Sequence, residues 1–567
     1  MADLLVRGGT VVDGTGAESF RADVRVRAGR IVEVGRELSP AGEPQLDADG
    51  ALVAPGFIDN HTHFDFQLFW DGCADPMPQH GVTTLLIGNC SLSLFPVREP
   101  IRRRLTDAFC FIEDLPTESV DAAVPWGWES YAQYRDALSA SGLGVNVQAL
   151  VGHTALRMYV MGDDAWERAA TATECARMAQ VLDESLHAGA YGLSTSFFDQ
   201  DAERRPVPSR HADDAEFASL LDVVARYPQR FVEFIPDVGG ADPRADIERL
   251  AALAGPRGVL LTWNGLFDLE YAPDVASAFL EQNRRLTASG VQIYPMMSPR
   301  SLDLRVNWDQ SMLFMGLPSW NRFVQARGDA KRALIEDPQW RAAARTEWDA
   351  ADNAMFPFRR LERIRLVEVA HLDNERWLRR SLADLRGEHG GHPSDVLADW
   401  VAANDMRPGV VVTGIGNGES DGVARLLAEP GLVVGAGDAG AHVQMQCTAG
   451  DTTLLLTRHV RERGDLGLEQ AVHALTGRQA ALFGLHDRGL VTPGMAADLT
   501  VFALDELEWA EDVFVADLPA GMRRLRRPPG GYRATVVAGE AVQIGGELTT
   551  ARRGRVLHAA ETVAAAR

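Results

Sequence analysis

The stretch LVAPGFIDNHTHFDFQLFWDGCADPMPQHGVTTLLIGNCS, residues 52–91, decides how the rest of the chain is interpreted. It predicts a buried strand that runs to His61-Thr62-His63 and a second buried strand that ends at Cys90. Side chains at i and i+2 of a strand share a face, so the two imidazoles project together. Two imidazoles and a thiolate at neighbouring strand ends predict a divalent-metal site, with zinc as the expected ion. The alternative is that one histidine caps the strand and the other is a buried structural residue.

The amino-acid composition disfavours several classes of partner and cellular compartment. The net charge of −23 over 567 residues disfavours nucleic acid and anionic membranes as partners. An odd number of scattered cysteines indicates a reducing compartment rather than a disulfide framework: Cys73, Cys90, Cys110, Cys175 and Cys447. No signal architecture opens the chain and no apolar run reaches membrane-spanning length. We therefore expect a cytoplasmic protein with a small-molecule substrate, and leave homo-oligomer formation open.

Lysine usage is unusual, because Lys331 is the only lysine among 56 basic residues. A Schiff-base mechanism, or a carboxylated lysine between two metals, would have only this residue to use. Lys331 lies in GDAKRALIED, which predicts an exposed helix and a solvated surface charge.

Both ends of the chain have strand character. Residues 3–50 predict short strands and a hairpin in ADVRVRAGRIVEVG, and strand patterns return after Leu485. A sheet this small needs a partner, so we expect the ends to pair. Residues 1–54 and 486–567 are predicted to form one small β-sandwich around an inserted domain.

Residues 55–485 alternate strand and helix patterns, which is typical of βα units and a parallel sheet. Eight units predict an α/β fold, a (β/α)8 TIM barrel with its active site at the carboxyl ends of the strands; an open doubly wound sheet is the alternative. Residues 298–408 interrupt the repeat with a large helical insertion that holds six tryptophans. We expect a lid or a substrate-pocket wall, or else tryptophans that form the insertion's own core.

Asp438 and His153 are the candidate catalytic residues. Asp438 ends the last predicted strand, in VVGAGDAGAH, where a carboxylate can bind metal and accept a proton from water, or simply cap a turn. His153 ends NVQALVGH at the same predicted rim and can polarise a carbonyl, bind metal or be structural. His442 is expected to support the site or to be structural.

Three residues are candidates for substrate binding. Arg300, in MMSPRSL, and Arg157, in GHTALRM, could hold a carboxylate bidentately, or could belong to structural ion pairs. Ser194, in GAYGLSTS, could hydrogen-bond substrate or form a turn. Neither a GxSxG elbow nor a phosphate-binding glycine loop is present in the sequence.

An ordered set of motifs carries a family resemblance: VAPGFIDNHTHFD, HGVTTLLIGNCS, VGHTALR, GAYGLSTS, GDAGAH and TPGMAADLTVF. Together they resemble the amidohydrolase superfamily and, within it, the N-acyl-D-amino-acid deacylase (D-aminoacylase) family. The resemblance implies a (β/α)8 barrel with a β-sandwich and amide hydrolysis by zinc-activated water. It further implies His61, His63, Cys90 and Asp438 as metal ligands, with Asp438 also the general base.

The chain departs from that family at two strand ends. The resemblance implies further zinc histidines after strands five and six, yet no histidine occurs between His211 and His371. The corresponding segments read VEFIPDV and LTWNGL, with Glu233 and Asn264 nearby. The chain is therefore expected to hold about one zinc ion as a divergent member that hydrolyses an N-acyl-D-amino acid or a related amide. The alternatives are a degenerate member that only binds a small molecule or partner, and a metal-assisted lyase or isomerase.

Overall fold

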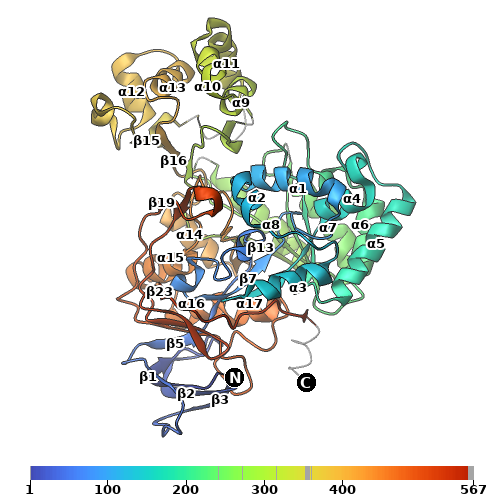
Figure 1. The fold of residues 1–567 in the computed structure, drawn as a ribbon, viewed down its shortest axis with the longest axis vertical. Helices are drawn as coiled ribbons and strands as arrows, with labels where there is room; N and C mark the ends of the chain where they lie inside the picture. The colour runs from blue at the N-terminus through green and yellow to red at the C-terminus, as the bar shows by residue number, and fades with distance from the viewer. Residues whose placement is uncertain are drawn as a thin grey trace.

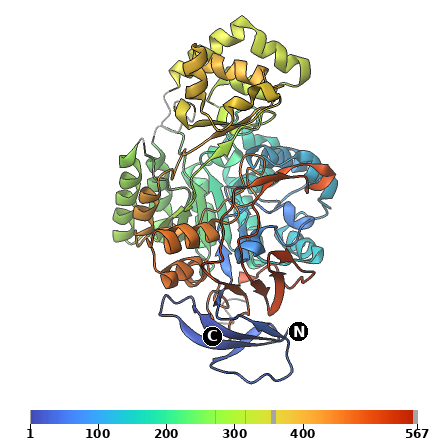
Figure 2. The same ribbon diagram turned by 90° about the vertical axis from the view of Figure 1, so that its left-hand side faces the viewer.

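A computed structural model describes residues 2–559, apart from residues 241, 271, 315, 352–357 and 359. A central α/β body lies between a strand-rich base and a separate helical lobe (Figures 1 and 2). The expected second sandwich segment ends in residues 560–567, which lie outside the described part. None of the described helices is both long enough and apolar enough to cross a membrane.

The strand-rich base joins the two ends of the chain in one nine-stranded sheet. Its centre is the antiparallel pairing of an early strand with a late one, in which Ala54 faces Thr500. Alternating burial along the strands places Val6, Val24 and Val53 in its core. The strands are β1 (Leu4–Val11), β2 (Phe20–Arg27), β3 (Arg30–Gly35), β4 (Gln45–Asp47), β5 (Leu52–Pro55), β18 (Leu499–Phe502), β21 (Ala534–Val537), β22 (Glu540–Ile544) and β23 (Glu547–Leu548).

The segment predicted as one strand before His61 is two strands. β5 belongs to the basal sheet, whereas β6 (Phe57–Asp59) pairs in parallel with β7 (Val82–Ile87) in the body. Gly56 separates them, and a Cβ at this position would lie 2.2 Å from the Thr83 hydroxyl oxygen. The chain thus crosses from base to body at a glycine that packs directly against the neighbouring strand.

The body is built on parallel strands in sequence order. β6, β7 and β8 (Asn146–Ala149) form one set. The next strand, β9 (Val151–Gly152), begins a second set that ends at β17, and a parallel bridge from Ala439 to Thr62 connects the end of this set back to β6. The second set comprises β9, β10 (Gly192–Ser196), β11 (Phe231–Ile235), β12 (Leu260–Trp263), β13 (Ile293–Met297) and β17 (Val433–Val434).

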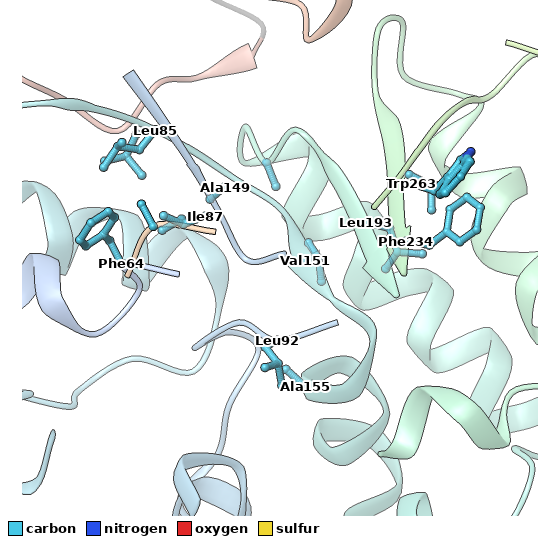
Figure 3. Packing of buried hydrophobic residues seen from close by; sticks show 14 of the residues in the cluster. Phe64, Leu85, Ile87, Leu92, Ala149, Val151, Ala155, Leu193, Phe234 and Trp263 are labelled. Carbon is cyan, nitrogen blue, oxygen red and sulfur yellow. The ribbon is translucent and has the colours of Figure 1, made fainter. Parts of the chain in front are cut away.

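Helices separate these strands and pack with their apolar faces on the sheet. Thr171 and Asp213 accept hydrogen bonds from the first turns of α5 and α6, which satisfies amide groups that would otherwise lack partners. Strand side chains such as Leu193, Phe234 and Trp263 fill the interface from neighbouring strands (Figure 3). The helices include α1 (Glu99–Ile112), α3 (Tyr131–Ser141), α4 (His153–Met161), α5 (Ala172–His187), α6 (Asp214–Val224), α7 (Pro243–Ala254), α8 (Pro273–Ala288), α14 (Ser420–Leu427), α16 (Leu468–Leu475) and α17 (Gly477–Leu482).

The insertion forms the lobe at the top of Figure 1 and has its own hydrophobic core. All six of its tryptophans are buried in that core, as the alternative interpretation of the sequence expected. Residues near its start, including Leu302, Leu304 and Leu313, line the main cavity of the body together with Ala351, which follows α11. Its elements are β14 (Leu304–Arg305), α9 (Pro318–Gln325), α10 (Gly328–Glu336), α11 (Pro338–Ala350), β15 (Ile364–Glu368), α12 (Leu382–His389), α13 (Pro393–Ala402) and β16 (Gly409–Val412).

The prediction that Lys331 is a solvated surface charge is wrong. Its side chain is buried within the insertion, where the ammonium group donates to the carbonyls of Trp308 and Val324. Asp309 lies 3.5 Å from the nitrogen, and the ring of Phe323 lies beneath it. The helical pattern of GDAKRALIED gave no sign of this role, because the acceptors come from separate segments.

Candidate metal centre

Three donor atoms from two strand ends converge in the body. The Nε2 atoms of His61 and His63 lie 3.3 Å apart, and Cys90 Sγ lies 3.4 Å from His61 Nε2. All three donor atoms lie within 4.8 Å of one another and are buried. Tetrahedral zinc separates two nitrogen ligands by about 3.3–3.4 Å and nitrogen from sulfur by about 3.5–3.6 Å. The donor set therefore fits a zinc ion in both chemistry and spacing.

Carboxylates lie behind the imidazoles, near Nδ1 atoms that have no hydrogen-bond partner among the described residues. His63 Nδ1 lies 3.2 Å from Glu113, and His61 Nδ1 lies 3.7 Å from Glu233. A carboxylate on one ring nitrogen fixes the tautomer and turns the other nitrogen toward a metal. Glu113, the residue after α1, also lines the cavity at this site. Sequence patterns did not indicate Glu113, because a carboxyl group after a helix is common.

Burial and neighbouring charges shift the pKa values of the three donors in different directions. Burial lowers the pKa of His61 to about 3, helped by the neighbouring His63, so that His61 is neutral. Burial also lowers the pKa of His63, but Glu113 and Asp438 outweigh it and raise the value to about 10. Burial raises the pKa of the Cys90 thiol well above its usual range. Loading a cation here would therefore release protons from His63 and Cys90.

The carboxylate of Asp438 lies beside the Nε2 atoms of both histidines. Its Oδ1 lies 3.2 Å from His63 Nε2 and 3.6 Å from His61 Nε2. His442 Nε2 lies 3.6 Å from Oδ2 and lines the same cavity. Burial raises the pKa of Asp438, but hydrogen bonding from His63 and the charges of His442 and His63 hold it below its usual range. The carboxylate is thus ionised and available to accept a proton.

Glu233 lies in the middle of β11 and Asn264 directly follows β12, the two strands that lack histidine. Glu233 Oε2 accepts a hydrogen bond from the Cys90 amide at 2.9 Å, and with the Asn264 amide turned to satisfy its neighbours, its nitrogen donates to Glu233 Oε1 at 2.8 Å. Burial raises the pKa of Glu233 to about 8. Both residues therefore brace the loop that carries the thiol.

The centre opens into a cavity of about 570 Å³. His63, Cys90 and Asp438 lie in its wall, and the remaining wall is largely apolar, with Phe198, Ile235, Phe267, Leu302 and Ile415 among the lining residues. Such a cavity accommodates a drug-sized ligand with an apolar part.

Besides the metal donor His61, three predicted site residues lie outside this wall: His153, Arg157 and Ser194. His153 opens α4 and is buried, with Nε2 2.7 Å from Glu216 and Nδ1 3.0 Å from Thr195. Arg157, fully buried, pairs with the same Glu216 carboxylate. Both expectations of contact with substrate find no support, because Glu216 holds both side chains in a structural ion-pair cluster. The sequence offered no signal that Glu216, on α6, would meet them.

The other two substrate candidates are also engaged in the protein. Ser194 is buried, and its hydroxyl donates to the Gly88 carbonyl at 2.5 Å, so it ties β10 to the end of β7. Arg300 does line the cavity, but its guanidinium pairs with Asp451 at 3.1 Å and donates to Gln446 at 2.8 Å. Arg204 is a second cavity arginine, and no carboxylate of the described residues lies within ion-pair distance of it.

Comparison with known proteins identifies the class. A model of the amidohydrolase family (Amidohydro_3) matches residues 45–543, so the chain belongs to this family. The family and its deacylase relatives make it a metal-dependent hydrolase of carbon–nitrogen bonds other than peptide bonds.

Individual relatives refine the comparison. The chain is 30% identical to an uncharacterised protein of Mycobacterium tuberculosis over 99% of this chain and 97% of that one. It is 29% identical to an N-acyl-D-aspartate deacylase of Alcaligenes xylosoxydans xylosoxydans, over 88% and 86% of the respective chains. A zinc-bound N-acyl-D-glutamate deacylase from Bordetella bronchiseptica, solved with a phosphonate inhibitor, is 25% identical with a TM-score of 0.68, over 98% and 99%.

Proposed function

We propose that this chain removes the acyl group from an N-acyl-D-amino acid or a closely related amide, with one zinc ion held by His61, His63 and Cys90. The observation that carries the proposal is the convergence of these donors, with the Asp438 carboxylate beside them, at a cavity whose wall includes His63, Cys90 and Asp438. The relatives named as D-amino-acid deacylases support the substrate class.

The catalytic steps are assigned to residues of the chain. When bound, zinc supplies Lewis-acid polarisation of the scissile carbonyl and makes water more acidic. Asp438 accepts the proton of the attacking water and returns it to the leaving nitrogen, as its ionised state and cavity position allow. His442 lies close enough to Asp438 to help hold the carboxylate in place.

Arg204 is proposed to hold the substrate carboxylate. Arg300 is already neutralised by Asp451, whereas Arg204 is exposed at the cavity and lacks an acidic partner among the described residues. A guanidinium can bind a carboxylate through two parallel hydrogen bonds. The apolar wall suits an acyl chain or an apolar amino-acid side chain, and the acidic groups Glu113, Asp199 and Asp237 disfavour an additional negative charge.

The fold is proposed to be a closed (β/α)8 barrel with a terminal β-sandwich. The parallel order from β6 to β17 and the return bridge from Ala439 to Thr62 support closure. The nine-stranded basal sheet supports the pairing of residues 1–54 with 486–567. Residues 298–408 are proposed to shape one wall of the cavity through the segment that holds Leu302 and Leu304.

Metal analysis combined with a substrate screen tests the function. Protein loaded with zinc and freed of excess metal should hold about one ion per chain and should hydrolyse N-acyl-D-amino acids in preference to the L-forms. Incorporation of one ¹⁸O atom from labelled water into the released acid would establish hydrolysis. Failure to bind zinc would favour a degenerate binding protein, and an unsaturated product without solvent oxygen would favour a lyase.

A further inference from the structure

A second cavity, of about 660 Å³, opens at the amino-terminal ends of β11, β12 and β13, whose carboxyl ends border the catalytic cavity. Arg230 lies in its wall and directly precedes β11, whose last residue, Ile235, lines the catalytic cavity. Leu260 begins β12 on the same wall, and Asn264 follows that strand at the catalytic side. A five-residue strand spans about 16 Å, so the two cavities are separate. We call this second site the basal cavity.

Two arginines in the basal cavity lack acidic partners. Arg230 is 8% exposed, its Nε has no hydrogen-bond partner, and Nη1 donates only to the Pro228 carbonyl at 3.3 Å. Arg478, on α17, donates to the Pro430 carbonyl at 2.7 Å. Across the described ranges, no carboxylate forms an ion pair with either guanidinium.

The protein has more acidic than basic residues, 79 against 56, so acidic partners for arginine are plentiful in the chain. Arg257, one position before the cavity residue Gly258, shows the ordinary pattern, because Asp222 lies 2.7 Å from its Nε. Burying an unpaired charge costs free energy unless a partner or hydrogen bonds compensate it. Arg230 lies over the Tyr191 ring, 5.7 Å from its centroid, but neither guanidinium has a carboxylate partner among the described residues, so the two groups indicate a site for an anionic ligand.

The surrounding groups agree with this interpretation. Burial lowers the pKa of Arg230, and only tyrosine hydroxyls, with Tyr191 the nearest in effect, act against that change. Burial likewise lowers the pKa of Arg478, opposed only by Tyr294. Leu260 and Leu482 make the rest of the wall partly apolar.

We propose that the basal cavity binds a small dianion, a phosphate- or dicarboxylate-bearing molecule, through the guanidinium groups of Arg230 and Arg478. Guanidinium groups bind oxyanions through paired hydrogen bonds, and a dianion that reaches both groups would neutralise both charges. Tyr294 adds a hydroxyl that can donate to the same ligand. The occupant lies at the opposite ends of β11, β12 and β13 from the metal centre and does not compete with substrate for space.

Calorimetric titration tests the proposal on the full-length protein, with inorganic phosphate and succinate as probes at constant ionic strength in chloride. Wild-type protein should bind at least one probe with one site per chain, and a saturating concentration should raise the Tm by about 1 °C or more. Arg478→Gln should weaken binding at least tenfold. Arg478→Lys keeps the positive charge but removes the paired donors of the guanidinium group, and it should weaken binding less than Arg478→Gln does.

Two control variants separate this site from others. Arg257→Gln removes a neighbouring arginine that already has an acidic partner, and Arg204→Gln removes the arginine of the catalytic cavity. Both should bind the probe like wild-type protein. The proposal is overturned if neither probe binds wild-type protein, if both Arg478 variants bind as tightly as wild type, or if Arg204→Gln abolishes binding.

Discussion

The carboxylate Oδ1 of Asp438 lies 3.2 Å from Nε2 of His63, although the two residues stand at opposite ends of the parallel strand order. Backbone hydrogen bonds fix the two segments that carry these residues side by side. The Asp438 amide donates to the His61 carbonyl at 2.8 Å, and the His63 amide donates to the Ala439 carbonyl at 2.8 Å. The φ of 61° at Asp438 turns the chain at this point. The main chain thus positions this carboxylate, which leaves its oxygens available for chemistry.

Replacing that carboxylate should separate catalysis from folding. Asp438→Asn keeps the size of the side chain but removes the proton acceptor, so we expect kcat to fall by about 10²–10⁴-fold. The three donors of His61, His63 and Cys90 remain, so zinc content should fall by less than half. Steady-state kinetics and elemental analysis measure the two quantities. Retention of more than a tenth of wild-type kcat would show that Asp438 is not the proton carrier.

The Cys90 thiol should be essential for metal binding. Cys90→Ala removes one of three converging donors, and we expect the zinc affinity to fall by at least 100-fold and activity to fall with it. Competition with a chromophoric chelator measures the affinity. Cys175→Ala is the matched control, because this thiol is buried on α5 away from the centre. Equal affinities for the two variants would remove Cys90 from the ligand set.

Arg204→Gln should impair substrate binding more than turnover. The loss of a paired hydrogen bond to a carboxylate is expected to raise KM about 10–100-fold and to change kcat much less. An N-acyl-D-amino-acid amide, which has no carboxylate, should be hydrolysed equally by both proteins.

The adjacent Arg205 supplies the control for this test. Its guanidinium already pairs with Asp201, with Nε at 2.7 Å from Oδ2, and it does not line the cavity. Arg205→Gln should therefore leave KM within about twofold of the wild-type value. If both variants raise KM alike, the effect comes from the loop and not from a contact with substrate.

The proximity of the three donors in the candidate metal centre could be predicted, because strand periodicity and strand ends bring them together. His61 and His63 share a face, and Cys90 ends the neighbouring strand, so local patterns suffice. Glu113 and Glu216 could not be found this way, because each acts on a residue from a distant element. The same reason explains Lys331, whose carbonyl acceptors include Trp308 in a separate loop. Sequence patterns identify faces of elements, but partners across elements depend on tertiary packing.

The buried cluster of His153, Arg157 and Glu216 should make stability depend on pH. Burial holds the pKa of His153 below its ordinary 6.5. Burial raises the pKa of Glu216, but hydrogen bonds from His153 and the charge of Arg157 outweigh it and leave the pKa below 4.5. In both cases the unfolded chain binds more protons than the folded one. The free energy of unfolding should therefore fall as the pH drops below about 6.5, and fall further below about 4.5.

The variant His153→Gln isolates the first of these two steps. Glutamine can still donate to Glu216 but does not titrate, so the variant should lose less stability than wild type between pH 7 and pH 5. The difference in slope should approach about 1.4 kcal/mol per pH unit, the limit for one proton, in urea unfolding followed by circular dichroism. Replacing the exposed His371 by Gln should leave the wild-type slope unchanged. Parallel pH profiles for wild type and His153→Gln would mean that the folded protein binds a proton at His153, and that Glu216 accepts from an imidazolium.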